Sequence, residues 1–132
     1  MANRIVWQPM RELTANSIIA TYQPLVDPND STVYGITTLA RQFIIHNDTD
    51  QPVYVSFSAP IGSDDSAVTY RQIFCPSKFA FTDDIATNKF ASSKDDGQAL
   101  AKGTIVTVRR AGSAPTAGNS VYFSYWCSSG DL

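Results

Sequence analysis

The sequence predicts an all-β protein: a single-domain antiparallel β-sandwich of jelly-roll-like or immunoglobulin-like topology, with an N-terminal arm. Val, Ile and Thr are abundant whereas Glu occurs once, at Glu12. β-branched side chains favour strands because their stiff χ1 angle suits a pleated surface better than a helix. Long Glu-, Lys- and Leu-rich segments with helical periodicity are absent. Short apolar runs instead alternate with clusters of Asp, Asn, Ser, Gly and Pro, as in sandwiches and barrels. The 132 residues suffice for one domain that folds without a disulfide or metal.

Residues 1–16 differ in pattern from the rest of the chain. Trp7, Pro9, Met10 and Leu13 are apolar but follow neither a strand nor a helix pattern. Two hypotheses fit this segment: an edge strand along the sandwich, or an arm that leaves the domain and lies on a neighbouring subunit. The sandwich domain is expected over residues 17–132. If the segment is an arm, deletion of residues 1–14 is expected to leave a folded domain.

Seven strands are expected in the sandwich domain, and alternation assigns their faces. In the segment 52–58, Val53, Val55 and Phe57 share one face whereas Tyr54 and Ser56 share the other, which is the period of a half-buried strand. The expected strands are Ile18–Val26, Leu39–Asn47, Pro52–Ser58, Ala67–Phe74, Lys78–Thr82, Thr104–Arg110 and Ser120–Cys127.

The last expected strand is apolar on both faces. Val121, Phe123 and Tyr125 alternate with Tyr122 and Trp126. Such a strand lies either in the centre of a fully covered sheet or beneath a surface that meets a partner.

Turn residues separate these strands. The segment 47–52 predicts a hairpin because Asn and Asp tolerate left-handed backbone. A second turn is expected over 112–119. The stretch 83–103 is longer and predicts an extended loop, where contacts to other molecules are commonly made.

The sequence lacks the groups that a catalytic site needs. His46 is the single histidine and lies at the end of an apolar strand, where a structural role is expected. Hydrolase, phosphate-loop and zinc-helix motifs are absent. Cys75 and Cys127 are 52 residues apart, which fits no zinc or redox motif, so buried thiols are expected unless their strands are neighbours. We therefore expect no enzyme activity and no cofactor.

Acidic pairs recur in the expected loops, among them Asp83-Asp84 and Asp95-Asp96. Carboxylates are ligands for hard cations such as calcium, but none of the pairs has the spacing of an EF-hand loop. Solvated turn residues explain them better, because Asp forms local turn hydrogen bonds. No metal site is predicted, and these loops would be the first place to search for calcium.

Charge and hydropathy exclude further classes. The net charge is −2, without the basic excess of a nucleic-acid-binding protein. No run approaches the 18 apolar residues of a membrane span, and residues 1–11 lack the apolar core of a signal peptide. We expect neither nucleic acid nor membrane as a partner.

Five segments of the chain follow one another in a characteristic order: Ser17–Leu25, Arg41–Ser58, Asp84–Lys89, Ala101–Arg110 and Ala114–Trp126. Their elements are structural: strands, an Asn-Asx-Thr turn, a Pro/Gly hairpin and a final aromatic strand. The order of these segments, which cover about three-quarters of the chain, resembles a family of small virion-associated proteins of short-tailed and related tailed bacteriophages. The resemblance implies an accessory structural component of the particle, located in the virion and assembled in the host cytoplasm.

The expected function is therefore structural and non-enzymatic. The protein is expected to form homo-oligomers and to attach to capsid, portal, adaptor or tail proteins, either at the head-to-tail junction or tail or as capsid decoration. The alternative is a carbohydrate-binding module whose aromatic last strand stacks on sugar rings. The residues expected at contacts are Trp7, Met10, Leu13, Asp83, Asp84, Asp95, Asp96, Tyr122 and Trp126.

Overall fold

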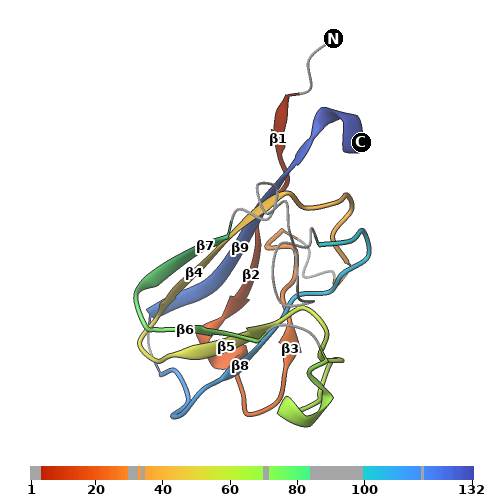
Figure 1. Cartoon of the computed structure of the whole chain (residues 1–132). Coiled ribbons are helices and arrows are strands. Elements are labelled where there is room, and N and C mark those ends of the chain that lie inside the picture. The colour runs from red at the N-terminus through yellow and green to blue at the C-terminus, as the bar shows by residue number, and fades with distance from the viewer. Residues whose placement is uncertain (1–3, 30–32, 34, 70–71, 84–99, 117) are drawn as a thin grey trace.

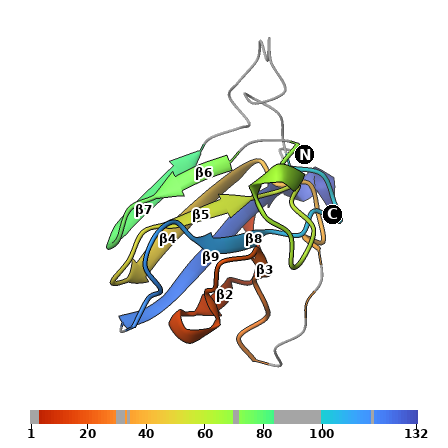
Figure 2. The ribbon, with the colours of Figure 1, turned by 90° about the horizontal axis from the view of Figure 1, so that it is seen from below.

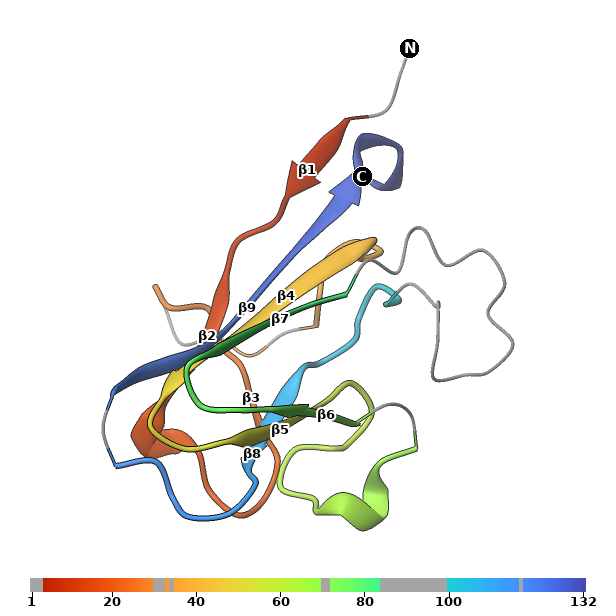
Figure 3. The same ribbon diagram turned by 60° about the vertical axis from the view of Figure 1, so that its left-hand side comes forward.

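Two antiparallel sheets pack face to face in the computed structural model, which describes residues 4–29, 33, 35–69, 72–83, 100–116 and 118–132 (Figures 1 and 3). This confirms the predicted all-β sandwich. One sheet has the order β1-β9-β4-β7, with β2 also pairing with β9, and the other has the order β3-β8-β5-β6. The strands are β1 (Ile5–Trp7), β2 (Arg11–Thr14), β3 (Gln23–Pro24), β4 (Gln42–Thr49), β5 (Val53–Ser56), β6 (Gln72–Cys75), β7 (Phe79–Asp83), β8 (Thr107–Arg110) and β9 (Gly118–Ser128). The described residues also form three short 3-10 helices: η1 (Ala15–Ser17) between β2 and β3, η2 (Asp65–Ala67) between β5 and β6, and η3 (Ser129–Asp131) after β9.

The strand pairing distinguishes between the two expected sandwich topologies. The pairs β2·β9, β3·β8, β4·β7 and β5·β6 are all antiparallel and nested in sequence, as in one long hairpin rolled into two sheets. This arrangement is the jelly roll. Strands β6 and β7 lie along one side of the sandwich and β2 and β3 along the opposite side (Figure 2). Strand β1 precedes the eight jelly-roll strands and extends the pairing of β9.

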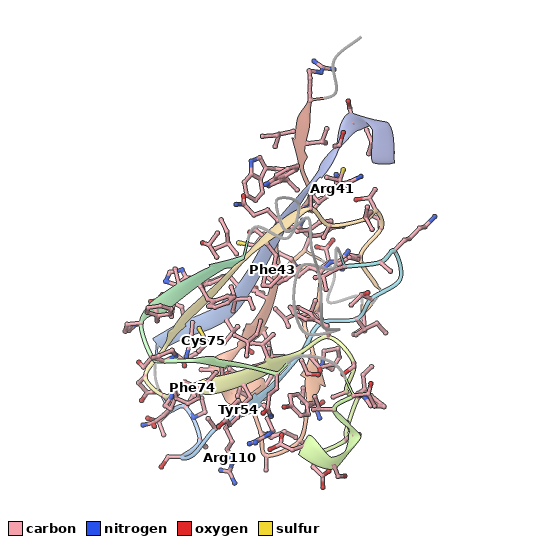
Figure 4. The ribbon with its side chains drawn as sticks, viewed as in Figure 1. Arg41, Phe43, Tyr54, Phe74, Cys75 and Arg110 are labelled. Carbon is pink, nitrogen blue, oxygen red and sulfur yellow. The ribbon has the colours of Figure 1, made fainter. Side chains whose placement is uncertain are left out.

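The core lies between the inner faces of the two sheets. Phe43 on β4 is fully buried (Figure 4). Its ring centroid lies 5.1 Å from that of Phe57 and 5.8 Å from that of Phe123. Val53 and Val55 are fully buried and Phe57 nearly so, as the alternation in this segment predicts. The same alternation leaves Tyr54 and Phe74 on the outer face of the four-stranded sheet.

Each of the seven predicted strand segments overlaps a strand, but five of the strands, β3, β4, β5, β6 and β8, are shorter than predicted, β3 and β6 by the most. Strand β3 is limited to two residues. Strand β6 begins at Gln72 because residues 65–67 form the turn η2, which the Asp64 side chain caps by accepting a 2.9 Å hydrogen bond from the Ser66 N–H. The capped turn therefore lies immediately before the predicted strand segment Ala67–Phe74 and takes up its first residue, Ala67.

The hairpin predicted at 47–52 is present, but left-handed backbone is not its cause. Lys78, with φ of 56°, is the only non-glycine residue with positive φ among those described. The buried Asn47 instead links the segments around it through its amide group, which donates to the carbonyl oxygens of Gln51 at 2.8 Å, Cys75 at 3.2 Å and Pro76 at 3.2 Å. Side-chain hydrogen bonding, the other property that makes Asn a turn residue, therefore shapes this turn.

The N-terminal segment pairs with β9 of its own chain. Strands β1 and β2 follow one another along the same edge of β9, and Leu13 lies opposite Val121. Leu13 is 6% exposed and belongs to the core. Backbone hydrogen bonds of 3.0 and 2.9 Å between Glu12 and Val26 also join β2 to the segment that follows β3. Deletion of residues 1–14 would thus remove a core strand, so it is not a clean test of an arm.

Candidate functional site

The candidate functional site is the outer face of the five-stranded sheet, where apolar side chains from β1, β4, β9 and the β1–β2 connection gather. We call it the outer apolar face. Its members share a register: residues that pair across β1, β9 and β4 point to the same side of the sheet. It comprises Ile5, Trp7, Met10, Ile44, Tyr122 and Trp126.

Three of these side chains are largely exposed. Ile5 is 62%, Trp7 51% and Met10 43% exposed. Trp7 lies directly opposite Trp126, in a pair where side chains of neighbouring strands come closest. The indole N–H of Trp126 donates to the Gln42 side-chain oxygen at 2.7 Å, so its polar group is already bonded. What the two tryptophans offer to a partner is therefore mainly apolar ring surface.

A shallow depression lies in the middle of this face. Met10, Ile44, His46, Tyr122 and Ser124 line it. The alternation of β4 turns Ile44 and His46 outward, opposite Ser124 and Tyr122 of β9. The His46 and Tyr122 ring centroids lie 6.1 Å apart. The depression combines an apolar wall with an imidazole and hydroxyl groups. It therefore suits a partner that presents both apolar and hydrogen-bonding groups.

The structure brings together four of the residues expected at contacts. Trp7, Met10, Tyr122 and Trp126 all lie on the outer apolar face. Leu13 does not, because its position opposite Val121 turns it into the core. Asp83 ends β7, where it pairs with Phe43. Asp84, Asp95 and Asp96 lie outside the described residues.

Sequence reasoning missed Ile5 and Ile44 as members of this face, and it missed His46 as a residue that lines the depression within it. The alternation of β4 carries a signal for two of them, since Phe43 and Ile45 are buried while Ile44 and His46 point outward. Ile5 joins the face through pairing with Ser128, far along the chain. No local pattern predicts a pairing at that distance.

A second cluster lies on the outer face of the four-stranded sheet. Arg109 binds Asp65 through two nitrogen atoms, one of them Nε at 2.7 Å. Its guanidinium lies over the Tyr54 ring, 4.6 Å from the centroid, and 5.7 Å from that of Tyr22. The Tyr22 hydroxyl donates to Asp65 at 3.0 Å, and the Gln72 amide donates to both of those oxygens at 2.8 Å.

These interactions fix the protonation states of the cluster. The Arg109 guanidinium, above all through its hydrogen bonds, holds the pKa of Asp65 below its usual range, and Asp65 in turn raises the pKa of Arg109. Burial is the main cause that raises the pKa of Tyr22. Charges and hydrogen bonds are thus satisfied within the cluster, which fastens the η2 turn to the sheet.

The described residues form no cluster that could hold a metal ion. Among them no group of three or more His, Cys, Asp or Glu side chains comes together. Cys75 and Cys127 are free and buried, on strands of different sheets, and burial raises the pKa of the Cys75 thiol. Within the same part of the chain, no helix has the length and apolar character to cross a bilayer.

Comparisons with protein families, with curated proteins and with solved structures find no match for this chain.

Proposed function

We propose that the chain is a non-enzymatic structural subunit of a tailed-bacteriophage particle, which self-associates and attaches to other virion proteins. The observation that carries the proposal is the outer apolar face. The head-to-tail junction or tail is the favoured location, on sequence resemblance, and the capsid surface is the other. The partners are further copies of this chain and capsid, portal, adaptor or tail proteins.

The energetics of the outer apolar face support an assembly role. Full burial of a large apolar side chain contributes about 1.5–3 kcal/mol, and Ile5, Trp7 and Met10 each leave more than two-fifths of their surface in solvent. Trp is also enriched among the residues that dominate binding at protein interfaces. Repetition of one weak contact across a symmetric particle gives firm attachment through effective concentration.

The fold is compatible with this proposal and with its rival. Jelly rolls recur in viral capsid proteins and in lectins. A fold on its own assigns no function, since one fold carries many sites. The choice between the two therefore depends on the outer apolar face and on the sequence resemblance to virion proteins.

The decisive experiment locates the chain in particles. We expect it to co-purify with intact phage particles on a density gradient, detected by mass spectrometry. The double variant Trp7→Ser/Met10→Ser is expected to fold and to be lost from particles, because both side chains lie on the outer apolar face. Phe74→Ser is the matched control: Phe74 is 50% exposed but lies on the opposite sheet. Equal incorporation of all variants would overturn the role of this face, and absence of the wild-type chain from particles would overturn the proposal.

Carbohydrate binding is the second candidate, favoured by the depression. Sugar rings stack on aromatic faces and need hydrogen-bonding groups at their rim, which Tyr122, His46 and Ser124 could supply. A glycan array on the wild type and on Tyr122→Ala tests it. Binding that Tyr122→Ala abolishes would favour this candidate, whereas silence of the array would leave the structural role.

A further inference from the structure

Strand β1 forms an open edge of the five-stranded sheet in the part of the chain that the structure describes. It pairs with β9 on one side, and no strand of the described residues pairs with its other side. Strand β4 begins at Gln42, opposite Trp126, so the β1–β9 ribbon continues past it and projects beyond the sandwich (Figures 1 and 3). An open strand edge that carries apolar side chains is a template for pairing with another strand.

The hydrogen-bonding pattern shows which backbone groups of β1 face outward. The Ser129 N–H donates to the Arg4 carbonyl at 2.8 Å, and the Gln8 N–H donates to the Tyr125 carbonyl at 2.9 Å. Antiparallel pairs alternate between residues that exchange hydrogen bonds and residues that do not. The even-numbered residues of this segment therefore direct their backbone groups toward β9. The N–H and C=O groups of Ile5 and Trp7 point to the open edge.

We infer that a second copy of this chain occupies this edge, through antiparallel pairing of β1 with β1 of its partner. The inference rests on the proposed self-association and specifies its geometry. A two-fold axis at Val6 places Ile5 opposite Trp7 of the partner subunit, and Trp7 opposite Ile5 of the partner subunit. The two pairs exchange four backbone hydrogen bonds, so all outward-facing groups of both residues are satisfied. The five-stranded sheets of the two copies then form one continuous sheet.

The sequence around β1 favours this register over its neighbour. An axis at Trp7 would bring Ile5 opposite Pro9 of the partner subunit, and proline has no N–H to donate. An axis at Val6 avoids that loss. It also joins the exposed side chains of Ile5 and Trp7 across the axis on the outer apolar face, while Val6 meets its own copy on the other side of the sheet.

A second copy of the chain is also the partner that fits an open edge only three residues long. In a two-fold symmetric contact, the same patch on each copy meets its own equivalent. Three residues per copy therefore form a self-complementary interface, and no second surface on the chain is needed. Three-residue pairing buries less than the roughly 1,600 Å² of a standard interface, so a weak dimer is expected. Weak pairing is sufficient where a particle supplies many simultaneous contacts.

Cysteine cross-linking tests the register of the β1–β1 pairing directly. The experiment uses the full chain with Cys127→Ala, because Cys127 pairs with Val6 and would compete for an introduced thiol. Under mild oxidation, Val6→Cys is expected to give a disulfide-linked dimer, since the two copies of residue 6 face each other across the axis. Ile5→Cys and Trp7→Cys are the matched controls, because each lies diagonal to its own copy, at a separation that a disulfide spans poorly. Their failure to cross-link is the expected result.

A proline variant measures the contribution of the open edge without introducing a thiol. Ile5→Pro removes an N–H that points away from β9, and in the symmetric dimer both copies lose it. We expect the dissociation constant in sedimentation equilibrium to rise about tenfold or more. Oligomers without Val6→Cys cross-links, or with cross-links at residue 5 or 7 instead, would overturn the edge pairing and leave self-association intact. A chain that stays monomeric and uncross-linked at all concentrations would overturn both.

Discussion

At the scale of single residues, Asn47 is a fully buried polar side chain that links two turns of the fold. Its amide group donates to three backbone carbonyls, and its side-chain oxygen accepts from the N–H of Thr49 at 3.1 Å and its hydroxyl at 2.7 Å. It thereby links the β4–β5 turn to the β6–β7 turn, which belong to opposite halves of the nested hairpins. Local sequence cannot predict this link, because its partners are 28 and 29 residues away.

Substitution Asn47→Ala is expected to destabilise the protein by about 2–4 kcal/mol, because it leaves buried backbone groups without partners. Urea unfolding followed by tryptophan fluorescence measures the change. The exposed Asn16 provides the control, since Asn16→Ala is expected to stay within about 0.5 kcal/mol of the wild type. A loss below about 1 kcal/mol for Asn47→Ala would show that the turns hold without it.

The interactions of Asp65 predict that the free energy of unfolding depends on pH in the acid range. Its pKa is lowered in the folded chain, chiefly by the hydrogen bonds from Arg109 and then by the Tyr22 hydroxyl. A lowered folded-state pKa stabilises the fold above the unfolded pKa of about 3.9, and this stabilisation is lost as pH falls through the folded-state pKa. The carboxylate is half exposed, so the contribution near neutral pH is limited to about 1 kcal/mol.

The wild type is therefore expected to be more stable than Asp65→Asn at neutral pH, and the difference should shrink from about pH 5 to about pH 3. Urea unfolding at several pH values measures it. In an Arg109→Gln background the same comparison should show little pH dependence, because the main cause of the pKa shift is gone. An equal difference at both ends of the range would contradict this account.

At the scale of elements, alternation predicted the faces of β9, and in β5 it predicted the buried Val53 and Val55 but not Ser56, which is fully buried although it shares a face with Tyr54. Tyr122 and Trp126 point outward and Val121, Phe123 and Tyr125 inward, because a strand with a period of two has only one way to bury its apolar side. Alternation fails where a residue pairs with a distant strand. Trp7 reaches the outer apolar face through its register with Trp126, and no property of residues 1–16 specifies that partner.

Strands β1 and β2 differ in what they contribute to the fold, although both pair with β9. Strand β2 supplies Leu13 to the core and forms the Glu12–Val26 bridge to the segment after β3, whereas β1 lies on the projecting ribbon. Deletion of residues 1–8 is therefore expected to leave a folded chain with a lower Tm. Deletion of residues 1–14 should cost more than the roughly 2–5 kcal/mol of a buried leucine and abolish cooperative unfolding. Circular dichroism during heating distinguishes the two, and a folded 1–14 deletion would show that β2 is dispensable.

At the scale of the whole molecule, pairing through β1 couples stability to protein concentration. Only folded chains associate into the dimer. Association therefore stabilises the folded state relative to the unfolded state, by an amount that grows as the protein concentration rises above the dissociation constant. From well below that constant to tenfold above it, the gain is about 1.4 kcal/mol, which corresponds to a rise in Tm of roughly 3–6 °C for a domain of this size.

Ile5→Pro is the control that assigns such a rise to β1, because it removes hydrogen bonds at the open edge and leaves the pairing with β9 intact. Its Tm is expected to change little over the same concentration range. If the wild type and Ile5→Pro rise equally, association uses another surface, and the outer apolar face away from β1 becomes the first candidate. If neither rises, the folded chain does not self-associate in the range measured, and the proposed assembly role loses the physical property on which it depends.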